Sequence, residues 1–186
     1  MKNQNQIRWI TYLALYAALS VVLKYASQMI PFLQMPQGGS IELEYLAIFI
    51  ASYHLGWKNG IIVGLLAWLL GFIFGFNNWF LNPMQYLLDY IIPVLVCGAA
   101  SALCPSKNEK VRLYGGVTIA MILKYASTVL SGVYYWPPEG SVAGTSAAWL
   151  YSLSYNAWYN LATLIVCIIL VPLLYRALAP VIRRNA

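Results

Sequence analysis

A long uncharged run near the C-terminus constrains this chain more than any other feature of its sequence. From Gly140 through Tyr175 no side chain is charged, and a helix of about 20 apolar residues already crosses the hydrocarbon core of a bilayer. The whole chain follows the same trend, because 61% of its residues are hydrophobic and only 9% are charged, against about 25% charged in a soluble domain. We therefore predict an integral membrane protein.

Turn-forming residues divide the chain into six apolar segments, and we predict each to be a transmembrane helix. The second segment is short for a span, so we expect it to be tilted or to start within the preceding loop. The predicted spans are residues 7–30, 42–56, 60–76, 83–104, 112–135 and 149–176. The expected fold is an all-α, polytopic bundle of six transmembrane helices that forms one domain over residues 1–186.

The basic residues predict how this bundle is oriented. Outside the span interiors, Lys and Arg occur only at the two chain ends and in the connections after the second and fourth spans. Because cytoplasmic loops collect Lys and Arg, we expect both termini to be cytoplasmic. The residues concerned are Lys2, Arg8, Lys58, Lys107, Lys110, Arg112, Arg176, Arg183 and Arg184.

Composition also excludes several classes of function. A net charge of +6 can indicate nucleic-acid binding, but here the basic residues lie where orientation signals are expected, so we predict no nucleic-acid partner. The three cysteines form no CxxC motif and no Cys/His cluster, which gives no reason to expect a metal. The phosphate-binding motif GxxxxGK[ST] is absent, so any ATP must be hydrolysed by a partner.

A few ionisable residues fall within the predicted spans, where each is a candidate for a functional site because burial in lipid is costly. They are Lys24, Asp89 and Lys124, together with Glu42 and Glu44 at the start of the second span. One interpretation is that Asp89 and Lys124 form a structural ion pair. The other is that both line a polar cavity and contact a solute, and the two are compatible.

Aromatic residues concentrate toward the predicted outer side of the membrane, and an interfacial belt explains part of them. It does not explain the polar stretch Tyr151-Ser152-Leu153-Ser154-Tyr155-Asn156, which continues into the last span. Tyr151 and Tyr155 share one helix face, and Asn156 lies beside that face. Acidic and amide groups combined with flat rings suit a flat, heteroaromatic, cationic solute.

Pairs of small residues indicate where helices approach closely. Gly60 with Gly64 and Gly71 with Gly75 are best interpreted as packing inside the bundle. Ala14 and Ala18 have the same spacing on the first span, where internal packing and docking of a partner both remain open.

Several motifs occur in order along the chain and together resemble one family. They are Met35-Pro36-Gln37-Gly38-Gly39-Ser40, Leu87-Leu88-Asp89-Tyr90, Leu123-Lys124-Tyr125 with Ser131-Gly132, and Tyr151-Ser152-Leu153-Ser154-Tyr155-Asn156. The chain resembles the thiamine-specific substrate-binding subunit (S-component) of energy-coupling factor transporters. The resemblance implies high-affinity thiamine capture in the plasma membrane of a bacterium, and association with a membrane-embedded coupling subunit and two ATPase subunits. It implies no cofactor in the chain itself.

The resemblance also assigns residues. It implies that the substrate-binding positions are Glu42, Asp89, Tyr90, Lys124, Thr128, Trp136, Tyr151 and Asn156. It implies that Ala14 and Ala18 form the small-residue motif that docks on the coupling subunit. Thr128 stands where the family often has a histidine, and Glu44 is an acid without a family counterpart.

Two alternatives stay open at this point. A related thiazole, pyrimidine or other small cationic compound is an alternative ligand. An intramembrane enzyme is an alternative class, although Asp89 has no second acid beside it for aspartyl chemistry, and His54, the one histidine, has no partner motif such as GxSxG. We therefore predict that the chain is not an enzyme.

Overall fold

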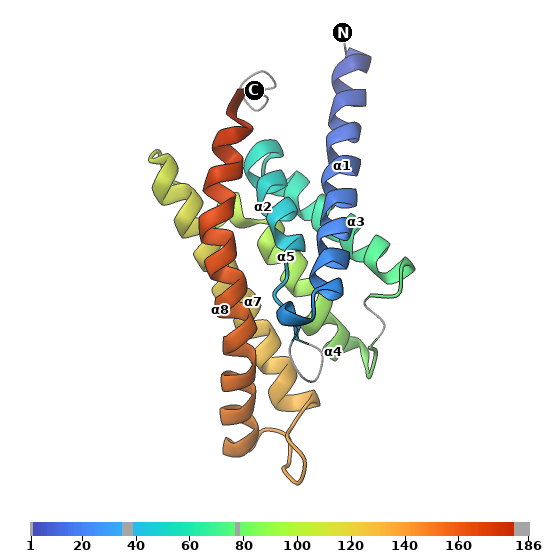
Figure 1. The fold of residues 1–186 in the computed structure, drawn as a ribbon, viewed down its shortest axis with the longest axis vertical. Helices are drawn as coiled ribbons and strands as arrows, with labels where there is room; N and C mark the ends of the chain where they lie inside the picture. The colour runs from blue at the N-terminus through green and yellow to red at the C-terminus, as the bar shows by residue number, and fades with distance from the viewer. Residues whose placement is uncertain (1, 35–38, 77–78, 181–186) are drawn as a thin grey trace.

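The computed structural model describes residues 2–34, 39–76 and 79–180, and helices make up most of them (Figure 1). The elements in chain order are α1 (Lys2–Met29), η1 (Pro31–Leu33), α2 (Glu44–Leu55), α3 (Trp57–Ile73), α4 (Pro83–Tyr86), η3 (Leu87–Ile91), α5 (Ile92–Gly98), α6 (Ala100–Leu103), α7 (Glu109–Tyr135) and α8 (Ser146–Ala177). Over these residues the all-α prediction is confirmed. Residues 35–38 of the first loop motif, and Arg183 and Arg184, lie outside the described residues.

Three described helices are long and apolar enough to cross a membrane, namely Gln6–Met29, Glu109–Tyr135 and Ser146–Ala177. Trp57–Ile73 and Pro83–Gly98 are shorter apolar helices. The fourth predicted segment is a succession of short elements, α4, η3, α5 and α6, rather than one regular helix. The limits of the individual membrane spans stay a prediction.

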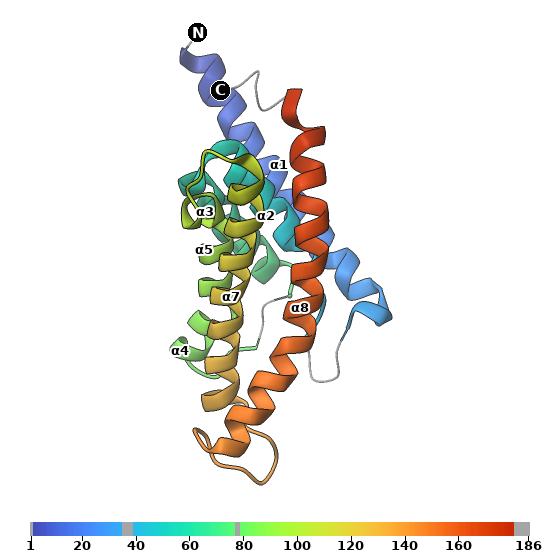
Figure 2. The same ribbon diagram turned by 90° about the vertical axis from the view of Figure 1, so that its left-hand side faces the viewer.

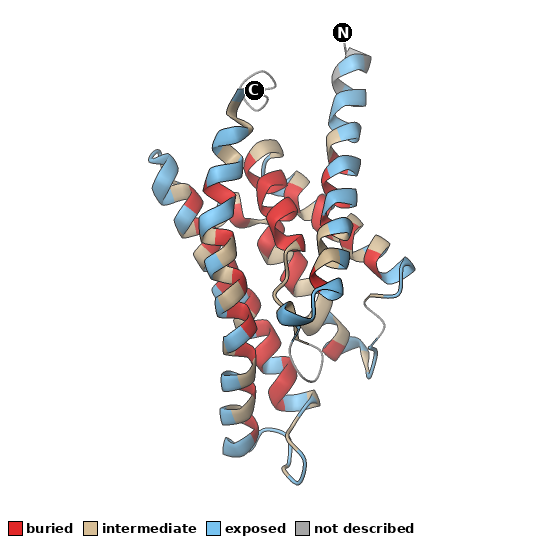
Figure 3. Cartoon of the chain, in the orientation of Figure 1, coloured by how far each residue is buried: buried red, intermediate tan, exposed pale blue. Residues whose placement is uncertain are grey.

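The short second segment has a structural explanation. Of the 12 residues of α2, only His54 and Leu55 are not buried, and the helix packs against α1, α3, α5 and α8. Figure 3 shows α2 as an almost continuous buried segment within the bundle. A helix enclosed by protein on its sides does not need to match the thickness of the lipid, so its length is set by its neighbours.

Capping residues fix where several helices begin. Asn108 precedes α7, and its Oδ1 accepts hydrogen bonds from the backbone N–H groups of Lys110 and Val111 at 3.0 and 3.4 Å. Thr145 caps α8 in the same way through the N–H of Ala148. Side-chain oxygens at this position satisfy helix N–H groups that have no partner within the helix.

The two ends of the bundle differ in charge. The start of α1 and the end of α8 lie at the same end of the molecule, whereas the connection between α7 and α8 lies at the opposite end (Figures 1 and 2). The basic connection between α6 and α7, which carries Lys107, lies at the same end of the molecule as the two termini. This arrangement agrees with the charge pattern of the sequence, while the orientation in a membrane stays a prediction.

Glycines allow α3 and α5 to touch through their backbones. A Cβ atom added to Gly98 would lie 2.6 Å from the carbonyl oxygen of Gly60 and 2.7 Å from Cα of Ile61. A Cβ atom added to Gly64 would likewise clash with the backbone of Val94, in the same contact between α3 and α5. The expectation that Gly60 and Gly64 serve packing inside the bundle is therefore met in the structure, because both are buried against α5.

We predict that Gly98→Ala destabilises the protein by about 1–3 kcal/mol, the usual cost of overpacking a close contact. The added methyl group meets backbone atoms, which cannot rotate away. Thermal unfolding in detergent should show a lower midpoint for this variant. Gly115→Ala is the matched control, since its methyl group would meet only the side chain of Cys104, and an equal loss in both variants would contradict the prediction.

Candidate ligand-binding cavity

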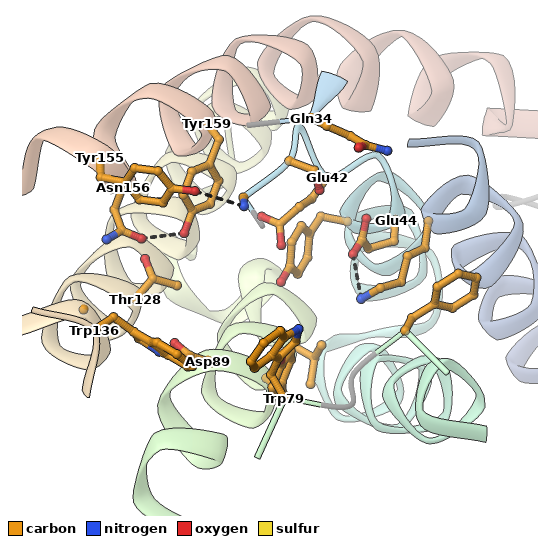
Figure 4. Close-up of a pocket in the computed structure, with 18 of the residues that line it drawn as sticks. Gln34, Glu42, Glu44, Trp79, Asp89, Thr128, Trp136, Tyr155, Asn156 and Tyr159 are labelled. Atoms are coloured by element: carbon orange, nitrogen blue, oxygen red, sulfur yellow. Dashed lines mark hydrogen bonds and ion pairs between the residues drawn. The ribbon is translucent and has the colours of Figure 1, made fainter. Parts of the chain in front are cut away.

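A cavity of 1010 Å³ lies between the helices and collects most of the polar residues singled out in the sequence (Figure 4). Its walls come from α1, α2, α3, η3, α5, α7 and α8, so segments far apart in the sequence meet there. Ligand pockets commonly measure about 300–1,000 Å³. The predicted binding residues that line this cavity are Glu42, Asp89, Tyr90, Thr128, Trp136, Tyr151 and Asn156. Lys124 does not line it.

Asp89 lies on one side of the cavity, held by two neutral donors. The Oδ2 atom of Asp89 accepts a hydrogen bond from Nε2 of Gln85 at 2.6 Å and from the indole Nε1 of Trp136 at 3.2 Å. Gln85 is fully buried, and its Oε1 accepts the backbone N–H of Leu81 at 3.0 Å. Both donors bind Oδ2, so Oδ1 has no hydrogen-bond donor among the described residues. The carboxylate is thus fixed in place with one oxygen available.

Aromatic rings form the opposite side of the cavity. Tyr151 and Tyr155 are stacked with centroids 5.9 Å apart and ring planes at 16°, as their shared helix face predicts. Tyr159 continues the series one turn later, and its hydroxyl donates to Oδ1 of Asn156 at 2.5 Å. Figure 4 shows Tyr155, Asn156 and Tyr159 across the cavity from Asp89. Flat rings from α8 therefore face the acidic side.

The loop that precedes α2 contacts these rings at Gly39. The backbone N–H of Gly39 donates to the hydroxyl of Tyr155 at 3.2 Å. A Cβ atom at this position would lie 3.0 Å from Cδ1 of Tyr159, so a glycine permits the close approach. The end of the loop motif therefore forms part of the wall of the cavity.

Lys124 is buried behind the cavity wall, with its ammonium group 2.5 Å from Oε2 of Glu42. It also donates to Oδ1 of Asn160 at 2.8 Å. The rings of Tyr45 and Tyr159 lie 5.1 and 5.2 Å from its Nζ atom, within cation–π range. Lys124 therefore pairs with Glu42, and the suggested ion pair between Asp89 and Lys124 is not what the structure contains.

Glu44, the acid without a family counterpart, also has a basic partner. Its Oε1 lies 3.2 Å from Nζ of Lys24 on α1, and both residues line the cavity. The hydroxyl of Ser20 donates to the backbone carbonyl of Glu44 at 3.1 Å. These contacts join the C-terminal half of α1 to the start of α2.

The charges that remain define the electrostatic character of the cavity. Glu42 and Glu44 are each neutralised by a lysine, whereas Asp89 and Glu139 have no ion pair among the described residues. Glu139 is an exposed residue at the edge of the lining. The cavity therefore carries an excess of negative charge, and a cation is the complementary ligand.

Thr128 and Tyr90 complete the predicted set. Thr128 is buried, and its hydroxyl donates to the carbonyl of Tyr125 at 3.0 Å and accepts from Nδ2 of Asn160 at 3.4 Å. The ring of Tyr90 packs on Tyr86 with a centroid distance of 4.8 Å. Tyr90 reaches the cavity from η3, the element that also carries Asp89, and Thr128 reaches it from α7.

Ala14 and Ala18 lie away from the cavity, on the outer surface of α1. Both are exposed, and they lie between two large exposed apolar side chains, Ile10 and Val22, at intervals of four residues. The alanines thus form the shallow centre of an apolar stripe, which we call the α1 stripe (Ile10, Ala14, Ala18 and Val22). Of the two interpretations of this pair, packing inside the bundle does not apply.

Sequence reasoning missed several residues of the cavity. Gln85 was missed although its spacing of four residues from Asp89 predicts a shared helix face. Tyr155 was placed on the same helix face as Tyr151 but was not assigned as a binding position, and Trp79 was not assigned either, yet both line the cavity. Trp79 packs edge-on against Trp136 with centroids 6.1 Å apart, a contact between loop residues that no periodicity could reveal.

Comparisons with known proteins agree with this geometry. The family model of the thiamine transporter protein (Thia_YuaJ) matches residues 10–183. The thiamine transporter ThiT of Bacillus subtilis (strain 168) is 34% identical over 187 aligned residues, covering 94% of each chain.

A solved structure of ThiT from Listeria monocytogenes has the same fold, with a TM-score of 0.72 at 20% identity, covering 95% of this chain and 98% of that one. Because the family model describes transporters, the intramembrane enzyme is set aside as a class. The match extends over nearly the whole chain, and the chain belongs to the thiamine transporter protein family.

Proposed function

We propose that the cavity captures thiamine and that the chain is the substrate-binding subunit of an energy-coupling factor transporter. The observation that carries the proposal is the carboxylate of Asp89, which has no ion-pair partner among the described residues and faces stacked rings in a cavity of 1010 Å³. Thiamine is a flat heteroaromatic cation whose thiazolium ring bears a permanent positive charge. Membership of the thiamine transporter protein family supports the same ligand.

The proposed roles follow from where each group lies. Asp89 supplies the negative charge, and Trp136 and Tyr151 supply ring faces for the ligand. Tyr90, Thr128 and Asn156 supply polar atoms at the cavity wall that orient the ligand, and Thr128 and Asn156 are themselves held in place by hydrogen bonds within the protein. Glu42 lines the cavity, and Lys124 acts through it by holding its carboxylate.

Delivery of the ligand requires partners. We propose that the chain resides in a bacterial plasma membrane with both termini in the cytoplasm, as the basic residues at one end of the bundle favour. The α1 stripe then serves as the docking surface for the coupling subunit, because small residues let two helices approach closely. Two partner ATPase subunits hydrolyse the ATP, and the chain itself needs no cofactor.

We predict that Asp89→Asn weakens thiamine binding by well over tenfold, because the amide keeps the shape of the side chain but removes its charge. Titration of the purified, ligand-free protein with thiamine, followed by tryptophan fluorescence, measures the effect. Thermal unfolding without ligand should stay close to that of the unsubstituted protein. An unchanged affinity would remove Asp89 from the site, and tighter binding of a competing thiazole or pyrimidine compound would identify a different ligand.

We predict that Ala14→Trp leaves thiamine binding intact and abolishes uptake by cells. The indole would protrude from the middle of the α1 stripe and keep a partner helix at a distance. Ala126→Trp is the matched control, since Ala126 is an exposed alanine on a different helix, and it should leave both binding and uptake unchanged. Normal uptake by the Ala14→Trp variant would refute the docking surface.

A further inference from the structure

The helix that carries Asp89 is irregular at the cavity. Between α4 and α5 the chain forms a π-helical turn, η3, in which the backbone N–H of Ile92 donates to the carbonyl of Leu87, five residues earlier. Such turns are rare and frequently occur at functional sites. Two residues of this turn, Asp89 and Tyr90, line the cavity. The register of η3 therefore decides where the acidic group points.

A proline leaves one carbonyl of this turn without a backbone donor. In the π-helical register the carbonyl of Leu88 would accept from residue 93, but Pro93 has no N–H group. In the α-helical register it would accept from Ile92, whose N–H already bonds Leu87. A backbone carbonyl away from water that stays unpaired costs free energy comparable to a lost hydrogen bond.

A side chain from another helix satisfies this carbonyl. The hydroxyl of Ser127, on α7, donates to the carbonyl oxygen of Leu88 at 2.7 Å. Ser127 is 4% exposed and does not line the cavity, so it has no direct access to a ligand. Its neighbour Thr128 does line the cavity, which places the bond directly behind the binding surface.

We infer that Ser127 is a positioning residue, which holds η3 in its π-helical register and thereby directs the carboxylate of Asp89 into the cavity. Without this hydroxyl, the turn relieves its unpaired carbonyl by moving the N–H of Ile92 from Leu87 to Leu88. That change rotates Asp89 and Tyr90 relative to α5 and breaks the alignment of Asp89 with Trp136. The inference rests on the proposed function, because it concerns the affinity for thiamine.

The first test compares two serines one turn apart on α7. Ser127→Ala should raise the Kd for thiamine about tenfold, the effect expected when a buried acceptor loses its partner. Ser131→Ala is the matched control, because the Ser131 hydroxyl is buried and has no hydrogen-bond partner among the described residues. It should leave the Kd unchanged. Equal affinities in the two variants would overturn the inference.

The second test separates positioning from general destabilisation. In an Asp89→Asn background, Ser127→Ala should change the Kd by less than about twofold, because its effect acts through the charge of Asp89. A merely structural role predicts the same tenfold loss in both backgrounds, and that result would contradict the inference. If the unsubstituted protein does not bind thiamine, the proposed function fails first, so the two failures are distinguishable.

The third test restores the missing donor. Pro93→Ala supplies an N–H group at residue 93, which can bond the carbonyl of Leu88 and make the serine hydroxyl unnecessary. The double variant Ser127→Ala/Pro93→Ala should therefore bind thiamine as tightly as Pro93→Ala alone. This comparison also serves if Ser127→Ala by itself does not fold. A tenfold loss on adding Ser127→Ala to the Pro93→Ala variant would overturn the inference.

Discussion

A lysine buried within the bundle is the constraint on which the rest of the cavity depends. Lys124 is 1% exposed, and an ammonium group in such surroundings is tolerated only if an opposite charge and further hydrogen bonds compensate it. Glu42 and Asn160 supply these contacts at 2.5 and 2.8 Å, and the rings of Tyr45 and Tyr159 flank the ammonium. The requirement to satisfy one cation thus ties α7 to α8 and to the chain just before α2.

Pairing of the other charges sets Asp89 apart from Glu42 and Glu44. Because Lys124 neutralises Glu42 and Lys24 neutralises Glu44, two of the acids at the cavity serve mainly to hold helices together. Asp89 differs, since its contacts are with the neutral donors Gln85 and Trp136. The charge of Asp89 is oriented by the protein without being cancelled, which suits it to meet a cationic ligand.

Helix α1 connects the two surfaces that the proposed function needs. Its inner face contributes Ser20 and Lys24 to the cavity and its contacts with α2. Its outer face presents the small residues Ala14 and Ala18. One side of α1 therefore lines the cavity, and the other side carries the α1 stripe that we propose as the docking surface.

The sequence by itself determined the membrane class and the all-helical character of the chain, because long apolar runs and the turn residues between them are local properties. It did not show that the fourth segment is a succession of short elements. It also placed the polar residues of the cavity, since an ionisable or amide group within an apolar run is visible without any structure. Asp89 and the stretch from Tyr151 to Asn156 were found in this way.

Only the tertiary structure decided which of these groups pair with each other. The spacing of Lys124 and Asp89 gave no means of knowing that Glu42, from a distant segment, would take the lysine. The buried bond from Ser127 to the carbonyl of Leu88 was equally hidden, because it depends on which faces of α7 and the α4–α5 segment meet. Pairing is decided by packing between segments far apart in the chain, whereas a one-dimensional pattern reports only on neighbours along it.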